Sequence, residues 1–364
     1  MLTKEELGVA GPYWDIGEVG DMHHNPAKNV LHVKFSVAEV AQRAALSVEL
    51  TEALLASAKG KLQAARLLRP EPFVDKTIYT HWNAMCVSAY LAAGRVLDLH
   101  EVREFALRSL DRVLAEAWRD GEMAHVVAYA DGPPRKPIAG MLDDYALMAL
   151  ACLDAWETTG ELGYYAYAEE IADAMVARFF DATGGGFLDT ATDGGERLGA
   201  LSARRKPLQD SPTPAGNSSA ASVLLRLAAL SGREDLREKA EATLEAFAGV
   251  VEHFGLYAAA YGIALQQWLA APVEVCVVGD GDAARKLGAV ATARFAVNKT
   301  VLVLADSQVR GELLPPVLAE TLPHLPGLGG ETFAVVCGGG RCSAPTQDAA
   351  EMIEQIGEAL DAEE

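Results

Sequence analysis

Two kinds of helical pattern alternate along the chain between about residues 37 and 270. In 100–117, apolar residues recur at helical spacing and charged residues fill the other positions, and 164–180 and 234–251 show the same pattern. The second kind carries almost no charge and is found in 82–97, 144–157, 217–230 and 257–270. A helix that is apolar all round must be covered on every side, so we predict an inner layer of covered helices and an outer layer of half-wet ones.

These two layers predict a mainly α fold, a partial (α/α) toroid of about four helical hairpins. The helices pair in order, 37–68 with 82–97, 100–117 with 144–157, 164–180 with 217–230, and 234–251 with 257–270. A helical solenoid is the competing architecture. The covered helices here start roughly 40–70 residues apart, whereas common helical repeats are ~34–47 residues long, and this favours the toroid.

The connections and the tail carry the β-structure. Two Gly-rich segments, 119–138 and 181–215, predict small β-hairpin insertions on one rim of the toroid. After Pro272, β-rich runs at 273–279, 300–305 and 332–337 alternate with candidate helices at 281–293 and 312–321. The expected domains are an irregular segment 1–36, the toroid portion 37–271, a small α/β appendage 272–350, and an acidic helix or tail 351–364.

Composition narrows the range of partners. The formal net charge of -20 disfavours nucleic acid, which is itself a polyanion. We find neither a signal peptide nor a convincing membrane span, so we expect a cytoplasmic protein without a membrane partner. Five cysteines form an odd, sparse set that fits reduced thiols, and Cys337 and Cys342 lack the spacing of a metal motif. No metal or cofactor is expected.

Polar and aromatic residues gather just before or at the start of each covered helix. In chain order these are Asp75, Lys76, His81, Trp82 and Asn83; Asp143, Asp144 and Tyr145; Arg205, Asp210, Asn217 and Ser218; and His253 and Tyr257. If the inner helices run parallel, their N-termini open on one rim and the clusters line one cavity. Taken singly, Asp, Asn and Ser before a helix are ordinary N-caps. Two adjacent carboxylates beside a covered helix need a cation or a polar ligand, so the pair Asp143–Asp144 is harder to explain as capping.

Two chemistries remain open at this rim. Glycoside hydrolysis needs two carboxyl groups, available from Asp75, Asp143, Asp144 and Asp210. Epimerisation needs groups that take and return a proton, available from His81, His125 and His253. We assign catalysis to Asp143, Asp144, Asp210, Asp75 and His81. We assign substrate binding to Trp82, Asn83, Tyr145, Lys76, Arg205, Asn217, Ser218 and Tyr257, since aromatic rings stack on the apolar faces of sugars.

Four segments at these clusters resemble a known family in the same order. They are DKTIYTHWNAM (75–85), GMLDDYALMAL (140–150), FFDATGGGF (179–187) and RRKPLQDSPTPAGNSSAASVLLRL (204–227), and FAVVCGGGRCSAPT (333–346) resembles the end of the same family. The sequence resembles the spermatogenesis-associated protein 20 family, thioredoxin-domain-containing proteins. The resemblance implies an α/α toroid similar to N-acylglucosamine 2-epimerases and six-hairpin glycosidases.

The resemblance starts beyond the thioredoxin-like domain and the first toroid hairpins of that family. An open toroid exposes the flanks of its end helices, and such exposure marks an interface. We therefore expect either a companion chain that carries the missing toroid half and the thioredoxin-like domain, or a homo-oligomer. The expected function is to bind or act on a sugar-like small molecule as part of such a split assembly. The alternatives are a non-catalytic scaffold or regulatory protein, and a complete sugar epimerase, isomerase or glycosidase.

Overall fold

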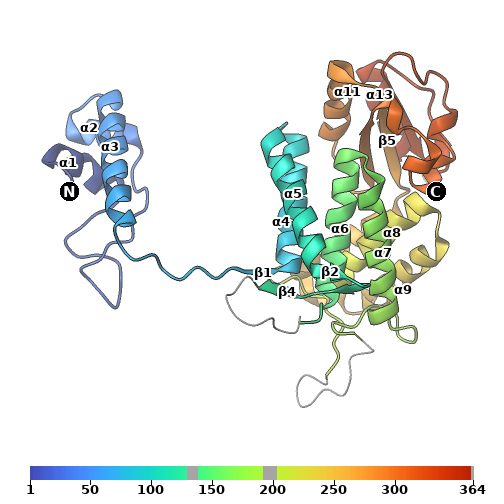
Figure 1. Ribbon diagram of the computed structural model, residues 1–364, viewed down its shortest axis with the longest axis horizontal. Coiled ribbons are helices and arrows are strands. Elements are labelled where there is room, and N and C mark those ends of the chain that lie inside the picture. The colour runs from blue at the N-terminus through green and yellow to red at the C-terminus, as the bar shows by residue number, and fades with distance from the viewer. Residues whose placement is uncertain (129–137, 192–202, 362–364) are drawn as a thin grey trace. The chain divides into compact units, whose positions relative to one another are not determined.

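The computed structural model describes residues 1–128, 138–191 and 203–361 (Figure 1). The chain divides into two compact units, residues 1–75 and 76–364. Each unit has its own hydrophobic core.

The N-terminal unit contains three helices, α1 (Lys4–Tyr13), α2 (Val37–Ala44) and α3 (Val48–Leu67). They pack around a small core of Val9, Ala10, Val40, Leu55 and Ala58. The segment predicted to be irregular thus contains α1. The single long helix predicted over 37–68 is also wrong. Ala45 has a φ of 52°, and the Ser47 hydroxyl caps the new helix by accepting from the Leu50 N–H, so the chain breaks there into two helices. Its predicted pairing with 82–97 stays a prediction, since it joins the two units.

The second unit is built on an arc of inner helices. These are α4 (Thr80–Val96), α6 (Leu142–Thr159), α8 (Gly216–Ser231) and α10 (Ala259–Leu269). Along the arc, α4 packs on α6, α6 on α8, and α8 on α10. The outer helices are α5 (His100–Ala117), α7 (Leu162–Phe179) and α9 (Glu234–Ala248) (Figure 1). This arrangement of inner and outer helices is the mainly α partial toroid that the sequence predicts.

Each outer helix packs mainly on the inner helix that precedes it. The sequence predicts that each outer helix forms a hairpin with the inner helix that follows it, for example 100–117 with 144–157. This prediction of the hairpin partners is wrong. The reason is connection length, because short turns tie neighbouring helices together. Gly160 and Gly232 end α6 and α8 in the left-handed conformation, with φ of 69° and 71°, and the next outer helix begins within two residues.

Burial differs between the middle and the ends of the arc. Helices α6 and α8 are covered on all sides, as their lack of charge predicts. Helices α4 and α10 keep apolar side chains at the surface, among them Tyr90 (44% exposed) and Ile263 (49% exposed). Among the described residues of this unit, a neighbouring inner helix packs on only one side of each, so the arc within this unit is open. The start of the segment predicted as helix 257–270 is a 3-10 turn, η2 (Val251–Ala258), which Gly255 interrupts at φ 51°.

The first insertion contains a true hairpin. Strands β2 (Trp118–Arg119) and β3 (Glu122–Met123) pair antiparallel, and β4 (Val126–Ala128) pairs antiparallel with β1 (Thr77–Tyr79), just before α4. In the second insertion, the part that the structure describes forms an isolated bridge between Phe180 and Phe187. The rest of both predicted hairpins, 129–137 and 192–202, lies outside the described residues.

The C-terminal appendage is a four-stranded sheet in the order β6-β5-β7-β8. Its strands are β5 (Val273–Val278), β6 (Lys299–Leu304), β7 (Phe333–Gly338) and β8 (Arg341–Cys342), close to the predicted runs. Helices α11 (Gly281–Ala293) and α13 (Ala349–Asp361) complete its core. The acidic helix expected after residue 350 is therefore part of this unit. The helix predicted over 312–321 is shorter: a 3-10 turn, η4 (Gly311–Leu313), precedes α12 (Pro316–Ala319), whose N-cap is Pro315.

The cysteine prediction fails for one pair. Cys337 and Cys342 are directly opposite each other on β7 and β8, and they form a disulfide. The tight hairpin creates this proximity, which ligand-spacing rules do not detect. Cys86, Cys152 and Cys276 are free thiols, and burial holds the pKa of the Cys152 thiol far above its ordinary value.

Among the described residues, no single helix has both the length and the apolar character of a membrane span. Only Glu234–Ala248 and Val251–Leu269 taken together meet those measures, across a bend of 110°.

The central position of α6 gives a stability prediction. Leu153 is fully buried in the middle of this helix, so Leu153→Ala is expected to lower the free energy of unfolding by about 2–5 kcal/mol through lost contacts and a cavity. Denaturant unfolding followed by circular dichroism measures this. Arg108→Ala on the wet face of α5 is the control, with an expected change within about 0.5 kcal/mol. Equal effects of the two substitutions would contradict the inner-layer position of α6.

Candidate functional site

The N-termini of the inner helices meet on one rim, as the sequence predicts. Asp144 in the first turn of α6 contacts His81 in the first turn of α4. A Cβ atom on Gly216, at the start of α8, would lie 2.2 Å from Oδ1 of Asp143, so these two helix starts are in close contact. Asp210 joins the last pair, because its carboxylate accepts from the N–H groups of Ala215 before α8 and Ala260 in α10.

Asp144 lies at the centre of this rim and is fully buried. Its Oδ1 is 3.0 Å from Nδ1 of His81, and its Oδ2 is 2.8 Å from Nδ1 of His125. The backbone N–H groups of His81 and Met141 also donate to the two oxygens, at 3.2 and 2.8 Å. One carboxylate is therefore shared by two histidines from different elements, and four N–H groups surround it.

The β-insertion positions His125 opposite α4. Its C=O accepts from the N–H of Thr80, and the Thr80 hydroxyl donates to the C=O of Ala124, at 3.0 and 2.6 Å. The rings of His81 and His125 stack with centroids 5.6 Å apart and an interplanar angle of 14°. Because each ring gives its Nδ1 side to a carboxylate, the hydrogen-bond network assigns the proton to Nδ1 and leaves Nε2 as the reactive nitrogen of each ring.

The charges of this cluster stabilise one another. The hydrogen bond to Asp144 raises the pKa of His125 against the opposing effect of burial. Burial alone would raise the pKa of Asp144, but the hydrogen bonds from His125, His81 and the Met141 N–H outweigh it and leave that pKa lowered. The network therefore favours an ionised Asp144 beside a charged His125.

Asp143 faces a separate cavity of about 470 Å³ next to this network. Burial raises the pKa of its carboxyl, and the negative charges of Asp144 and Asp189 add to the effect, while His81 opposes it. The cavity wall also includes Asp189, Arg205, Lys206 and Phe254. Of the two adjacent aspartates, Asp143 is thus the one whose carboxyl is held toward its neutral form.

Several predicted binding residues hold the rim together. Asn217 is buried, and its side-chain amide bonds the N–H and C=O of Phe187 and the C=O of Pro207. Asn83 donates to the C=O of Tyr79. The Tyr145 hydroxyl accepts from the Met123 N–H deep in the core. These contacts engage both ends of the Asn217 amide, the Nδ2 group of Asn83 and the Tyr145 hydroxyl.

The other predicted residues differ in access to solvent. The Trp82 ring is 51% exposed and packs against Tyr79 with centroids 4.7 Å apart. Arg205 lines the cavity beside Asp143. The Ser218 hydroxyl is buried and has no hydrogen-bond partner among the described residues. The remaining predicted residues lie at the surface or outside this unit: Lys76 and Tyr257 are exposed, as is His253, and Asp75 belongs to the N-terminal unit.

Two residues of the rim were outside the predicted site set. Sequence reasoning gives His125 only as a possible acid or base, because it lies 45 residues from Thr80, its partner in space. Asp189 was not considered, since nothing in FLDTAT distinguishes it from a turn residue. The signal in the sequence that points to His125 is its position directly before Val126 and Val127 in a β-rich segment.

Replacing the shared carboxylate tests the network. Asp144→Asn is expected to lower the pKa of His125 toward its ordinary value and to cost about 1.5–3 kcal/mol of unfolding free energy. A raised histidine pKa stabilises the fold below about pH 6.5, and this contribution is lost as the pH rises through the raised value. The cost of the substitution should therefore be larger at about pH 5.5 than at about pH 9. Histidine titration by NMR and denaturant unfolding measure these effects.

Asp181→Asn is the matched control, because Asp181 pairs with Lys206 rather than with a histidine. An unchanged His125 titration in Asp144→Asn would contradict the shared-carboxylate arrangement.

Sequence comparison relates this chain to curated proteins. It is 29% identical to spermatogenesis-associated protein 20 of Homo sapiens over 338 residues, which cover 89% of this chain and 42% of that protein. It is 32% identical to the Rattus norvegicus protein of the same name over 248 residues, which cover 66% of this chain and 30% of that protein. The chain thus spans less than half the length of these relatives. No family model matches it.

Solved structures show weaker likeness. A cellobiose 2-epimerase from Bacillus thermoamylovorans is 16% identical with a TM-score of 0.38, covering 48% of this chain and 45% of that chain. A GH76 α-mannanase from Bacteroides thetaiotaomicron is 18% identical with a TM-score of 0.36, with the same coverage. Through its curated relatives, the chain is identified as a sequence relative of the spermatogenesis-associated protein 20 family over most of its length.

Proposed function

We propose that the rim is a two-histidine proton-transfer site for a sugar-like small molecule, of the epimerase or isomerase kind. The observation that carries this proposal is the pair of stacked imidazoles that share Asp144. Both reactions remove a proton from the carbon beside a carbonyl group. Epimerisation returns a proton to the other face of that carbon, and isomerisation returns it to the neighbouring carbon, so each needs a base and an acid close together. Two histidines with one shared carboxylate supply both.

The shared carboxylate supports this division of labour. Asp144 carries one negative charge, which balances one imidazolium, while a second positive charge in the stacked ring would be repelled. One ring then acts as the acid and the other as the base, each through Nε2. Asp144 is a positioning residue in this scheme, because it orients both rings from behind.

The surroundings support a polyhydroxy ligand. Trp82 presents a half-exposed ring next to His81, with centroids 5.7 Å apart, and such a ring stacks on the apolar face of a sugar. Asp143, Asp189 and Arg205 line the neighbouring cavity and offer hydrogen bonds to hydroxyl groups.

Glycoside hydrolysis is the weaker alternative at this rim. It requires two carboxyl groups free to act on the glycosidic bond. Asp144 is enclosed by four N–H groups, and both oxygens of Asp210 accept from backbone N–H groups. Two carboxyl groups line the cavity, those of Asp143 and Asp189, but Oδ1 of Asp189 accepts from the Arg205 N–H, so Asp143 is the less engaged of the two.

The same three groups are close enough to hold a metal ion, because one ligand atom from each of His81, His125 and Asp144 lies within 4.8 Å of the others. The contacts favour hydrogen bonding, since the N–O distances of 2.8 and 3.0 Å fit an intervening proton. Two backbone N–H groups further stabilise the carboxylate without a cation.

The open arc supports the proposal of a split assembly. Apolar side chains are exposed on both end helices, on α4 at Tyr90 and on α10 at Ile263, and the outer helix α5 adds Phe105. The Tyr90 and Phe105 rings contact each other, with centroids 5.7 Å apart, and form a patch. We propose that further toroid helices cover these flanks, from a companion chain that also carries the thioredoxin-like domain or from a second copy. A non-catalytic scaffold remains the alternative if the covered protein lacks proton transfer.

Proton transfer is tested by exchange with solvent. The assembled protein, incubated with mannose, glucose or N-acetylglucosamine in deuterium oxide, is expected to incorporate deuterium beside the carbonyl carbon, as seen by proton NMR. His81→Asn and His125→Asn should each slow exchange by about 100-fold or more, because each removes the acid or the base. His253→Asn is the matched control and should be neutral, because this histidine is exposed and is not one of the two that bond Asp144.

EDTA treatment separates the two readings of the cluster. Exchange that survives EDTA supports the acid–base pair, and exchange that is lost and restored by zinc supports the metal centre. Absence of exchange with every sugar in the assembled protein would contradict the catalytic proposal.

The assembly is tested by light scattering after size-exclusion chromatography. The chain is expected to exceed its monomer mass, or to form a complex when it is co-expressed with a chain that carries the missing toroid helices. Tyr90→Glu and Ile263→Glu should weaken that association, because each puts a charge on a proposed interface. Phe295→Glu, at an exposed apolar residue beyond α11, is the control. A monomer in both preparations would contradict the split assembly.

A further inference from the structure

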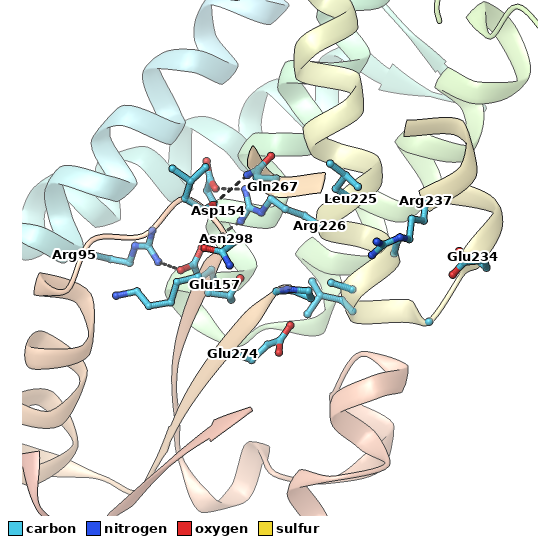
Figure 2. A pocket seen from close by; sticks show the side chains of 18 residues that line it. Arg95, Asp154, Glu157, Leu225, Arg226, Glu234, Arg237, Gln267, Glu274 and Asn298 are labelled. Carbon is cyan, nitrogen blue, oxygen red and sulfur yellow. Dashed lines mark hydrogen bonds and ion pairs between the residues drawn. The ribbon is translucent and has the colours of Figure 1, made fainter. Parts of the chain in front are cut away.

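A second cavity lies at the opposite ends of the same inner helices. It has a volume of about 330 Å³, and Figure 2 shows side chains from the toroid and from the sheet projecting into it. Its polar lining residues are Arg95, Asp154, Glu157, Arg226, Glu234, Arg237, Gln267, Glu274, Asn298, Lys299 and Thr300. The proton-transfer rim uses none of these residues.

Most of the charge in this cavity is already paired. Arg95 contacts Glu157 at 2.6 Å, and Arg226 contacts Asp154 at 2.7 Å and Glu157 at 3.2 Å. Glu157 also accepts from the Val301 N–H at the sheet. These two guanidinium groups and two carboxylates form a closed network that ties α4, α6 and α8 to β6 (Figure 2). The carboxylates of this network are paired, while Nε of Arg95 on α4 is buried and has no hydrogen-bond partner among the described residues.

Glu274 is outside this network. It lies on β5 between Val273 and Val275, whose side chains pack into the core with α11 and α13. Strand alternation therefore turns Glu274 to the other face, toward the toroid and into the cavity. Within the part of the chain that the structure describes, its carboxyl has no side-chain hydrogen bond or ion pair, and burial raises its pKa to about 7. The carboxyl is partly buried and its hydrogen-bond donor is its own backbone N–H, so it is incompletely solvated at a cost to the fold.

A second acceptor in the same cavity also lacks a donor. Oε1 of Gln267, on α10, is buried and has no hydrogen-bond partner among the described residues, while its Nε2 donates to the C=O of Val297. The amine of Lys299 is directed away, because it donates to the C=O groups of Ala291 and Arg294 at the end of α11. The unsatisfied donor, Nε of Arg95, belongs to the ion-pair network on α4, whereas the unsatisfied groups of β5 and α10 are acceptors. That side of the cavity therefore calls for a ligand rich in N–H donors.

The rest of the wall is apolar. Leu225, Ala228, Ala229, Leu230 and Pro272 line it. A ligand that fits has a donor-rich head and a short hydrocarbon body.

We infer that this cavity binds a small primary amine in its ammonium form, with the ammonium group at Glu274 and Oε1 of Gln267 and the hydrocarbon body against α8. An ammonium group has three donors and a positive charge, so it satisfies both acceptors and balances an ionised Glu274. The inference is independent of the function proposed for the opposite rim.

Binding of a cation requires Glu274 to be ionised, so affinity should rise with pH through about 7. The charged groups that face the cavity are Arg95 on α4, Asp154 and Glu157 on α6, Arg226 on α8, Glu234 and Arg237 on α9, and Lys299 on β6. Lys299 also titrates nearby, because burial lowers its pKa to about 8. A variant of Glu274 is needed to separate the effect of its titration on binding from that of Lys299.

Calorimetric titration of the full chain with benzylamine tests the inference, with benzyl alcohol as the neutral analogue of nearly equal size. One benzylamine is expected to bind per chain, and roughly tenfold or more tightly at about pH 8 than at about pH 5.5, since only the ionised fraction of Glu274 is competent. Benzyl alcohol should bind at least about tenfold more weakly, because it lacks the charge.

The matched variants are Glu274→Gln and Glu331→Gln. Glu274→Gln should weaken benzylamine binding at about pH 8 by about tenfold or more, and Glu331→Gln, at an exposed glutamate of the same appendage, should leave it unchanged. Thermal unfolding of both variants checks that the fold persists. Benzylamine binding that is absent at pH 8, equal in Glu274→Gln, or matched by benzyl alcohol would overturn the inference. If Glu274→Gln fails to fold, carbon NMR of Glu274 decides instead, because benzylamine must lower its pKa.

Discussion

The buried carboxylate of Asp144 is the constraint on which the rim depends. A fully buried charge is tolerated only if hydrogen bonds replace its lost hydration, and four N–H groups do so here. Those groups come from α4, from the β-insertion and from the turn before α6. Satisfying one carboxylate therefore fixes the position of the first two inner helices and of the insertion relative to one another. The stacked histidines follow from this geometry.

The sequence predicts the layers well because layering is a local property. Segments with few charges, such as 144–157 and 217–230, became the covered helices α6 and α8, and the three β-rich runs after Pro272 became β5, β6 and β7. The choice of which helices pack together is not a local property. The short turns at Gly160 and Gly232 decided which outer helix packs on which inner helix, and the capping of α3 by Ser47 divided a segment that has helical periodicity throughout.

The candidate site was predicted in place but only in part by role. The clusters before the inner helices do meet on one rim, which parallel inner helices require. The sequence singles out the adjacent pair of aspartates, but it cannot say that Asp144 is enclosed while Asp143 lines a cavity. Asn217 and Asp210 have side chains occupied by backbone groups, and no property of a single sequence separates such residues from ligand-binding ones. The cavity beside Glu274 was missed, because its wall combines a strand with the far ends of four helices.

The protonation pattern of the two histidines tests the account most directly. Long-range nitrogen–proton correlation NMR distinguishes Nδ1–H from Nε2–H in a neutral imidazole and detects metal coordination. The account predicts that the neutral rings of His81 and His125 both carry the proton on Nδ1 and none on Nε2, and that EDTA leaves both signals unchanged. Protons on Nε2 in the neutral rings, or signals that shift when metal is removed, would contradict a carboxylate shared by two histidines.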